Sequence, residues 1–150
     1  MHTTVENWLE KSRDELDEVY RQANPGTIPD CDTRGTAIAV AFGSGYSKIV
    51  AAFARLFAWQ GKVFDLFTSD KQSGVLINKI TPFSASFIVA KVYRDASWLD
   101  GKETIVIDYS STSFVAKKIR DEIREVEPGV YLGKVWWGKK RILDFALTRS

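Results

Sequence analysis

Apolar residues follow a helical pattern near the start of the chain and a strand pattern later. The early pattern predicts a helix over residues 3–23, where apolar side chains recur every three or four positions. Thr3 and Glu6 have the spacing of a capping box, and a Pro-Gly pair after residue 24 ends the helix. A second helix is predicted over residues 47–59, whose apolar side chains form one stripe.

From about residue 61 onward, short apolar runs alternate with turn residues, which is typical of β-strands. An earlier apolar run between two glycines predicts a buried strand, preceded by an irregular connection over residues 27–35. The last two runs pivot on Gly138, Lys139 and Lys140, which suits a tight hairpin. The predicted strands are residues 36–42, 62–67, 74–80, 86–94, 103–109, 130–137 and 141–147.

Residues 110–126 fit two structures. Ser and Thr residues at 111–113 can cap a helix, and good helix formers follow them. Residues 120–126 can equally form a polar strand that turns into Val130. We favour a short helix over residues 112–118 followed by a strand.

The predicted fold class is mainly β, with two or three helices in a single domain over residues 1–150. Many neighbouring antiparallel strands favour a sheet that closes on itself, because closure removes exposed edges. We therefore expect an antiparallel, lipocalin-like β-barrel, preceded by the N-terminal helix and covered by the second helix. A barrel of about eight strands either fills with side chains or holds one small ligand.

The charge and cysteine content limit the environment and the partners of the chain. The net charge of +2 is too balanced to indicate nucleic-acid binding. Basic residues cluster at Lys134 and 139–141, where we expect them to keep the hairpin soluble and its edge protected rather than to contact phosphate or a membrane. Cys31 has no disulfide partner, and no signal segment is recognisable, so we expect a cytoplasmic protein. No apolar run has the roughly 20 residues of an integral membrane span, and a homodimer is left open.

Few chemistries fit the side chains that are present. His2 is the sole histidine, which argues against a histidine-based triad and, with one cysteine, against a zinc or iron site. Asp30 and Asp32 are expected to be turn residues rather than calcium ligands. We therefore expect no metal and no cofactor. General acid and base chemistry by carboxylate, lysine or tyrosine remains, as does the absence of catalysis.

Three residues are the catalytic candidates. Asp108 follows the apolar run 105–107, where burial of a carboxylate is costly without a partner. Lys91 and Tyr93 share one face of their predicted strand. If that face points inward, Lys91 could meet Asp108 or an anionic ligand group. The alternative is that Lys91 faces solvent, Asp108 ends a strand and Tyr93 packs in the core.

Aromatic residues are more numerous than a core of this size requires. They make up 13% of the chain and include five Trp, which favours a ligand-binding cavity. Alternate strand residues face opposite ways, so Tyr131, Val135 and Trp137 share one face and Lys134 and Trp136 the other. Which face looks inward is left open. The candidate ligand-binding residues are Trp59, Phe64, Tyr93, Trp98, Tyr109, Tyr131, Trp136 and Trp137.

The segment Trp59-Gln-Gly-Lys-Val-Phe64 resembles the Trp-x-Gly-Lys-x-Phe segment of the bacterial GXWXG-type proteins. Residues 105–109, 119–126 and 130–133 follow a similar order of strands, although the Gly-x-Trp-x-Gly motif itself does not occur. More loosely, the overall pattern resembles the calycin superfamily of lipocalin-like barrels. The resemblance implies a cavity for a small lipophilic or aromatic ligand and carries no activity.

Two other functional hypotheses are open. The first is an enzyme on a conical α+β fold similar to the nuclear-transport-factor superfamily. In it, Asp108, Lys91 and Tyr93 would perform isomerase, cyclase or epoxide-hydrolase chemistry. The second is a protein-interaction module that uses an exposed Trp136 or Trp137, because adjacent residues of a strand face opposite ways.

Overall fold

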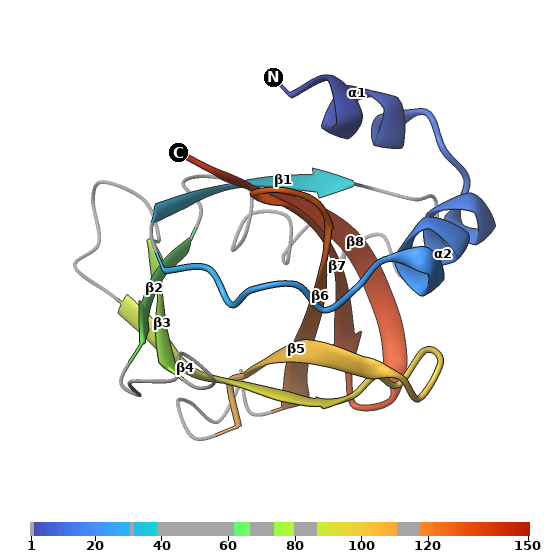
Figure 1. The fold of residues 1–150 in the computed structure, drawn as a ribbon. Coiled ribbons are helices and arrows are strands. Elements are labelled where there is room, and N and C mark those ends of the chain that lie inside the picture. The colour runs from blue at the N-terminus through green and yellow to red at the C-terminus, as the bar shows by residue number, and fades with distance from the viewer. Residues whose placement is uncertain (1, 31, 39–61, 67–73, 80–86, 111–117) are drawn as a thin grey trace.

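The computed structural model describes residues 2–30, 32–38, 62–66, 74–79, 87–110 and 118–150. The chain is mainly β, as predicted, and its described residues include two helices (Figure 1). The helices are α1 (Thr3–Leu9) and α2 (Arg13–Gln22). The strands are β1 (Asp32–Ile38), β2 (Lys62–Leu66), β3 (Gly74–Lys79), β4 (Phe87–Ala96), β5 (Glu103–Asp108), β6 (Ile119–Glu127), β7 (Val130–Trp137) and β8 (Lys140–Arg149).

The eight strands pair in sequence order, each antiparallel to the next, and β8 pairs with β1 to complete a barrel. The β1–β8 seam runs from Thr33 to Ile38 on β1, whereas β1 and β2 share only the pairs at Asp32 and Thr33. The resemblance of this barrel to lipocalins stays a prediction.

The N-terminal helix was predicted as one unit and is two. Ser12 breaks it by capping α2: its hydroxyl accepts from the Glu15 N–H at 3.2 Å, and the Glu15 carboxylate accepts from the Ser12 N–H at 2.7 Å. This reciprocal pair satisfies two N–H groups that a helix start leaves unbonded, so it begins a new helix. The predicted capping box at Thr3 is not formed, because α1 is capped by His2.

Most predicted strands correspond to observed ones, with ends shifted by at most two residues. The exception is β1, which begins at Asp32 inside the segment predicted to be irregular, because its backbone pairs with β8 from Thr33 onward. Strand β6 confirms the prediction of a strand over residues 120–126. The predicted helix over 47–59, residues 112–117 of the predicted short helix and residues 39–42 of the predicted strand 36–42 lie outside the described residues.

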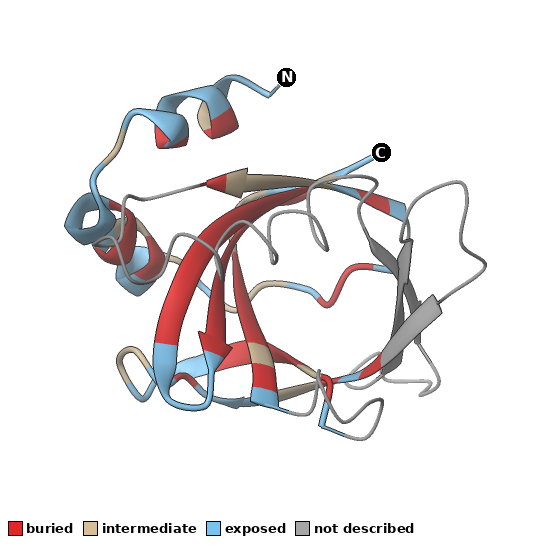
Figure 2. Ribbon diagram, turned by 180° about the vertical axis from the view of Figure 1, so that it is seen from behind, coloured by how far each residue is buried: buried red, intermediate tan, exposed pale blue. Residues whose placement is uncertain are grey.

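Each face of the barrel wall carries a cluster of buried apolar residues. One cluster joins α1 and α2 to the wall and includes Trp8, Leu16, Tyr20, Leu132 and Ala146, so these strand residues face outward. The strand residues of the other cluster largely alternate with them and face inward; the cluster contains Ile105, Ile107, Ile123, Val135, Phe145 and Leu147. Figure 2 shows buried residues running along β6, β7 and β8.

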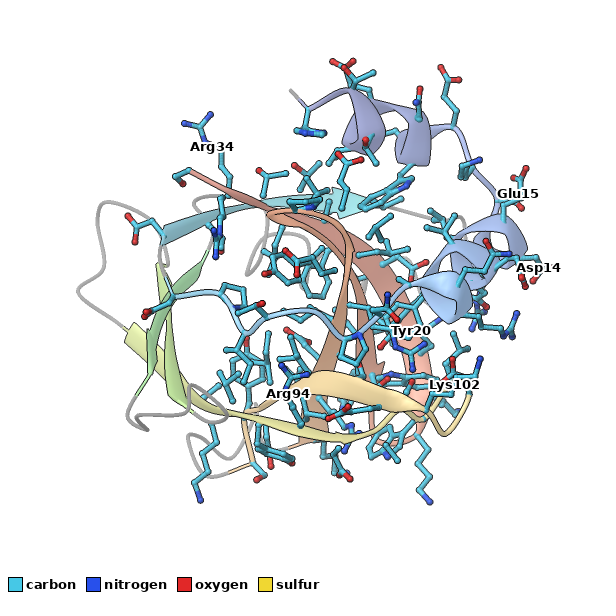
Figure 3. All side chains as sticks on the ribbon, in the orientation of Figure 1. Asp14, Glu15, Tyr20, Arg34, Arg94 and Lys102 are labelled. Carbon is cyan, nitrogen blue, oxygen red and sulfur yellow. The ribbon has the colours of Figure 1, made fainter. Side chains whose placement is uncertain are left out.

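The crossing segment, residues 24–30, passes over one end of the barrel between α2 and β1 (light blue in Figure 1). Its Ile28 is fully buried in the inward cluster. The Thr27 carbonyl accepts a hydrogen bond from the Tyr131 hydroxyl, and the Gly26 carbonyl accepts one from Arg94, each at 2.7 Å (Arg94 is labelled in Figure 3). These contacts anchor the segment to strands β4 and β7.

No helix among the described residues is long and apolar enough to cross a membrane.

Candidate functional site

The aromatic candidates divide between the two faces of the barrel wall. Tyr109 and Tyr131 are fully buried on the inward side, which settles that the Tyr131 face of the C-terminal hairpin looks inward. Tyr93, Trp98 and Trp136 lie on the outside and do not line the interior.

Three further aromatic predictions have separate outcomes. Trp137 shares the inward register of Val135, but it lies at the end of β7 and is 37% exposed. Trp59 lies outside the described residues, and of Phe64 only the backbone position in β2 is described. Of the adjacent pair, Trp136 is buried and Trp137 is the exposed residue.

A polar pair lies within the inward apolar face. The Tyr109 hydroxyl donates to Asp121 Oδ2 at 3.4 Å, and both residues are almost fully buried. Asp121 lies on β6 between Ile119 and Ile123, which belong to the inward cluster. Sequence reasoning missed Asp121 because β6 is rich in charged residues. Alternation along β6 is the signal that would have placed it inward.

Two of the three predicted catalytic residues, Tyr93 and Asp108, lie at a pocket of about 320 Å³ on the outer face, which we call the outer pocket. Tyr93 on β4 donates its hydroxyl to Asp108 Oδ2 on β5 at 3.0 Å, and the Ser110 N–H donates to Asp108 Oδ1 at 2.8 Å. Lys91 is paired with Asp108 in the strand register, but it is exposed and makes no ion pair with any described acid. The outer pocket is lined by Tyr93, Trp98, Asp108, Ser110, Lys118, Ile119, Arg120 and Gly138.

The protonation states of the Tyr93–Asp108 pair follow from their surroundings. Burial raises the pKa of Asp108, but hydrogen bonds from Ser110 and Tyr93 and the charge of Arg120 outweigh it, so the pKa lies below its usual value. Burial, then the hydrogen bond to Asp108, raises the pKa of Tyr93 to about 12. At neutral pH the pair is therefore a carboxylate and a neutral phenol.

One wall of the outer pocket is held by Glu122, which is fully buried. Its carboxylate accepts from Ser97 Oγ at 2.6 Å, from the Trp98 N–H at 2.8 Å and from Arg120 Nε at 3.1 Å. The Arg120 guanidinium lies 4.5 Å from the Trp98 ring centre, and the edge of Trp98 packs on Trp136. The wall is thus fixed by charge-assisted hydrogen bonds.

A buried charge cluster, Asp17, Lys134, Arg141 and Asp144, lies between α2 and the outer face. Lys134 Nζ donates to Asp17 Oδ1 at 2.9 Å and to Asp144 Oδ2 at 3.0 Å. Arg141 donates to both oxygens of Asp17. Lys134 and Arg141 were predicted to keep the hairpin soluble; that prediction is wrong, because α2 supplies Asp17 and covers them. Lys139 and Lys140 remain exposed.

The pKa values of the two acids in this cluster are shifted in opposite directions. Burial raises the pKa of Asp17, but its bonds to Arg141 and Lys134 outweigh burial and leave the pKa lowered. For Asp144, burial dominates over the attraction of Lys134 and Arg141, so its pKa is raised. The cluster fixes α2 to the wall and is largely shielded from solvent.

Comparisons with known proteins add the fold and no activity. No family model matches the chain, and no curated protein matches it. A crystal structure of a protein from Thermomonospora curvata is similar to it, with a TM-score of 0.57 and 18% sequence identity. The match covers 97% of this chain and 93% of that chain. At this identity, the likeness concerns the fold alone.

Proposed function

We propose that this protein binds a small apolar or aromatic molecule inside a lipocalin-like barrel. The observation that carries the proposal is the buried Tyr109–Asp121 pair on the inward apolar face. Burying a carboxylate beside aliphatic side chains costs free energy, and a barrel filled only for stability gains more from another apolar residue. A polar pair at this position therefore favours an interior that orients a ligand.

The inward residues indicate the chemistry of the ligand. Aliphatic side chains and the rings of Tyr109, Tyr131 and Phe145 favour a flat or aliphatic body. The Asp121 carboxylate would accept a hydrogen bond from a hydroxyl or amine of the ligand, and the Tyr109 hydroxyl, which donates to Asp121, would contact the same polar group.

A dye titration tests the proposal on the pure protein. The probe is 1-anilinonaphthalene-8-sulfonate, whose fluorescence rises in apolar sites, and the variants are Tyr109→Phe and Asp121→Asn. We expect each variant to change the dye affinity at least several-fold, because each alters one group of the inward pair. Tyr93→Phe is the matched control on the outer face and should leave the affinity unchanged.

Two outcomes would contradict the proposal. One is a folded protein that gives no dye signal and binds none of a panel of small aromatic alcohols and amines. The other is binding that responds to Tyr93→Phe and not to the inward variants, which would move the site to the outer pocket.

An enzyme that uses Asp108, Lys91 and Tyr93 is the second candidate, and the Tyr93–Asp108 hydrogen bond in the outer pocket favours it. The pair is poorly tuned for proton transfer: the pKa of Asp108 is lowered, which weakens it as a base, and the pKa of Tyr93 is raised to about 12, which weakens it as an acid. Turnover of an epoxide or isomerisable substrate that Asp108→Asn abolishes, with stability kept, would establish this function.

A further inference from the structure

A cationic and aromatic surface lies at the barrel end opposite the crossing segment. We call it the hairpin tip, and its members are Lys118, Trp137, Gly138, Lys139 and Lys140. The Gly138 N–H donates to the Lys118 carbonyl at 2.9 Å, which holds the start of β6 against the β7–β8 turn. All five residues are exposed, Trp137 by 37%, and Figure 2 shows this turn as an exposed loop.

The lysines of the hairpin tip carry charge that no described acid neutralises. None of the three forms an ion pair with a described carboxylate, unlike Lys134 and Arg141 of the buried charge cluster. Asp108, near the tip, is already bonded to Tyr93 and Ser110. The described residues of the connections at this end, 109–110, 118 and 138–139, contain no Asp or Glu. The local charge is therefore positive although the whole chain is nearly neutral.

We infer that the hairpin tip docks on the surface of an anionic phospholipid bilayer. Tryptophan favours the headgroup region, where its ring is desolvated and its N–H stays hydrated, and exposed lysines are attracted to anionic headgroups. A single indole among lysines on one turn is too small for a stable protein interface. It is sufficient for weak, reversible attachment to a charged membrane surface.

The orientation of docking bears on how a ligand would reach the interior. This step alone rests on the proposed function. The crossing segment covers one barrel end with Ile28 and is hydrogen-bonded to Arg94 and Tyr131. An apolar ligand would therefore exchange at the other end, which is the end that carries the hairpin tip. Docking there would let a ligand pass between the bilayer and the interior without crossing water.

Vesicle flotation tests the docking. The full chain is mixed with vesicles of phosphatidylcholine alone or of phosphatidylcholine with phosphatidylserine, and the bound fraction is measured. We expect binding to the anionic vesicles only, weakening as salt is added. The triple variant Lys118→Gln, Lys139→Gln, Lys140→Gln should bind about a hundredfold less tightly, since each lysine near an anionic surface contributes several-fold in affinity.

Matched controls separate the hairpin tip from general charge. The variant Lys11→Gln, Arg21→Gln, Lys102→Gln removes the same charge from other surfaces and should retain most of the binding. Trp137→Ala should weaken binding about tenfold, whereas Leu9→Ala, which removes another exposed apolar side chain, should not. Circular dichroism confirms that each variant is folded.

Three outcomes would overturn the inference: no binding to anionic vesicles, equal losses in both triple variants, or binding to heparin or an acidic protein with none to vesicles. The last would assign the hairpin tip to an acidic macromolecule. These outcomes are independent of the proposed function, because dye binding in solution does not use the tip. Loss of vesicle binding with dye binding intact would overturn docking alone.

Discussion

At the scale of single residues, the fold constrains the residue type most clearly where a larger side chain would not fit and where a buried charge depends on one counter-ion. Gly26 in the crossing segment has φ +72°, and a Cβ there would lie 2.2 Å from the Glu125 Cβ. Arg124, almost fully buried, forms a two-pronged ion pair with Asp100 at 2.6 and 2.8 Å. The sequence shows a glycine in a turn and an arginine in a polar strand, and neither role is visible from the pattern.

We predict that Gly26→Ala lowers the free energy of unfolding by more than about 2 kcal/mol, because it adds a steric clash to a strained backbone conformation. Gly101→Ala is the matched control: Gly101 has φ +74° and nothing within 4 Å of the added Cβ. It should cost only the conformational strain, about 1 kcal/mol. Urea unfolding measures both variants, and equal losses would show that the contact with Glu125 does not matter.

We predict that Asp100→Asn destabilises the fold by about 3–5 kcal/mol at neutral pH, because it leaves the buried Arg124 without its counter-ion. The hydrogen bond from Arg124 lowers the pKa of Asp100. The pair therefore contributes stability above the unfolded-state pKa of Asp100, and that stability is lost as the pH falls through the lower, folded-state pKa. Urea unfolding from neutral pH down to about pH 3 should show the difference between wild type and variant shrinking; a constant difference would contradict this role of Asp100.

At the scale of elements, helix α2 is attached to the barrel wall through the buried charge cluster as well as through apolar contacts. Leu16 and Tyr20 lie in the outer apolar cluster, and Asp17 bonds Lys134 and Arg141. The alternation in β7 was predicted from the sequence, whereas the capping box of Ser12 and Glu15 was missed although its spacing is present. The contact between α2 and β7 could not be predicted, because nothing in the sequence around Lys134 distinguishes a lysine covered by a helix from one in solvent.

We predict that Lys134→Met destabilises the protein by about 3–5 kcal/mol, because Asp17 and Asp144 then share one buried cation, Arg141. Adding Asp144→Asn to Lys134→Met should recover part of the loss, since it removes the carboxylate left without a partner. Chemical denaturation of the two single variants and the double variant gives the coupling energy. Strictly additive losses would show that the two residues act independently.

At the scale of the whole molecule, the alternation of strand residues predicted most of the eight-strand order, because turn residues separate the strands clearly. Alternation also fixes which hairpin residues share a face, but only the placement of α1 and α2 on the outside decides that Tyr131 looks inward. Because the sequence does not show which face of each strand looks inward, it led to Asp108 and Tyr93 and missed Asp121. Both pairs are phenol–carboxylate contacts, and only their position relative to the wall separates an outer pocket from an interior anchor.

The central claim is that the interior of the barrel holds a small apolar or aromatic molecule. Native mass spectrometry of the full chain, purified without detergent from its own host, tests it most directly. We predict a protein ion heavier than the apoprotein by the mass of one small lipophilic compound, and loss of that species in Asp121→Asn. A wild-type protein that is consistently at the mass of the bare chain, while folded and able to reach host lipids, would contradict the claim.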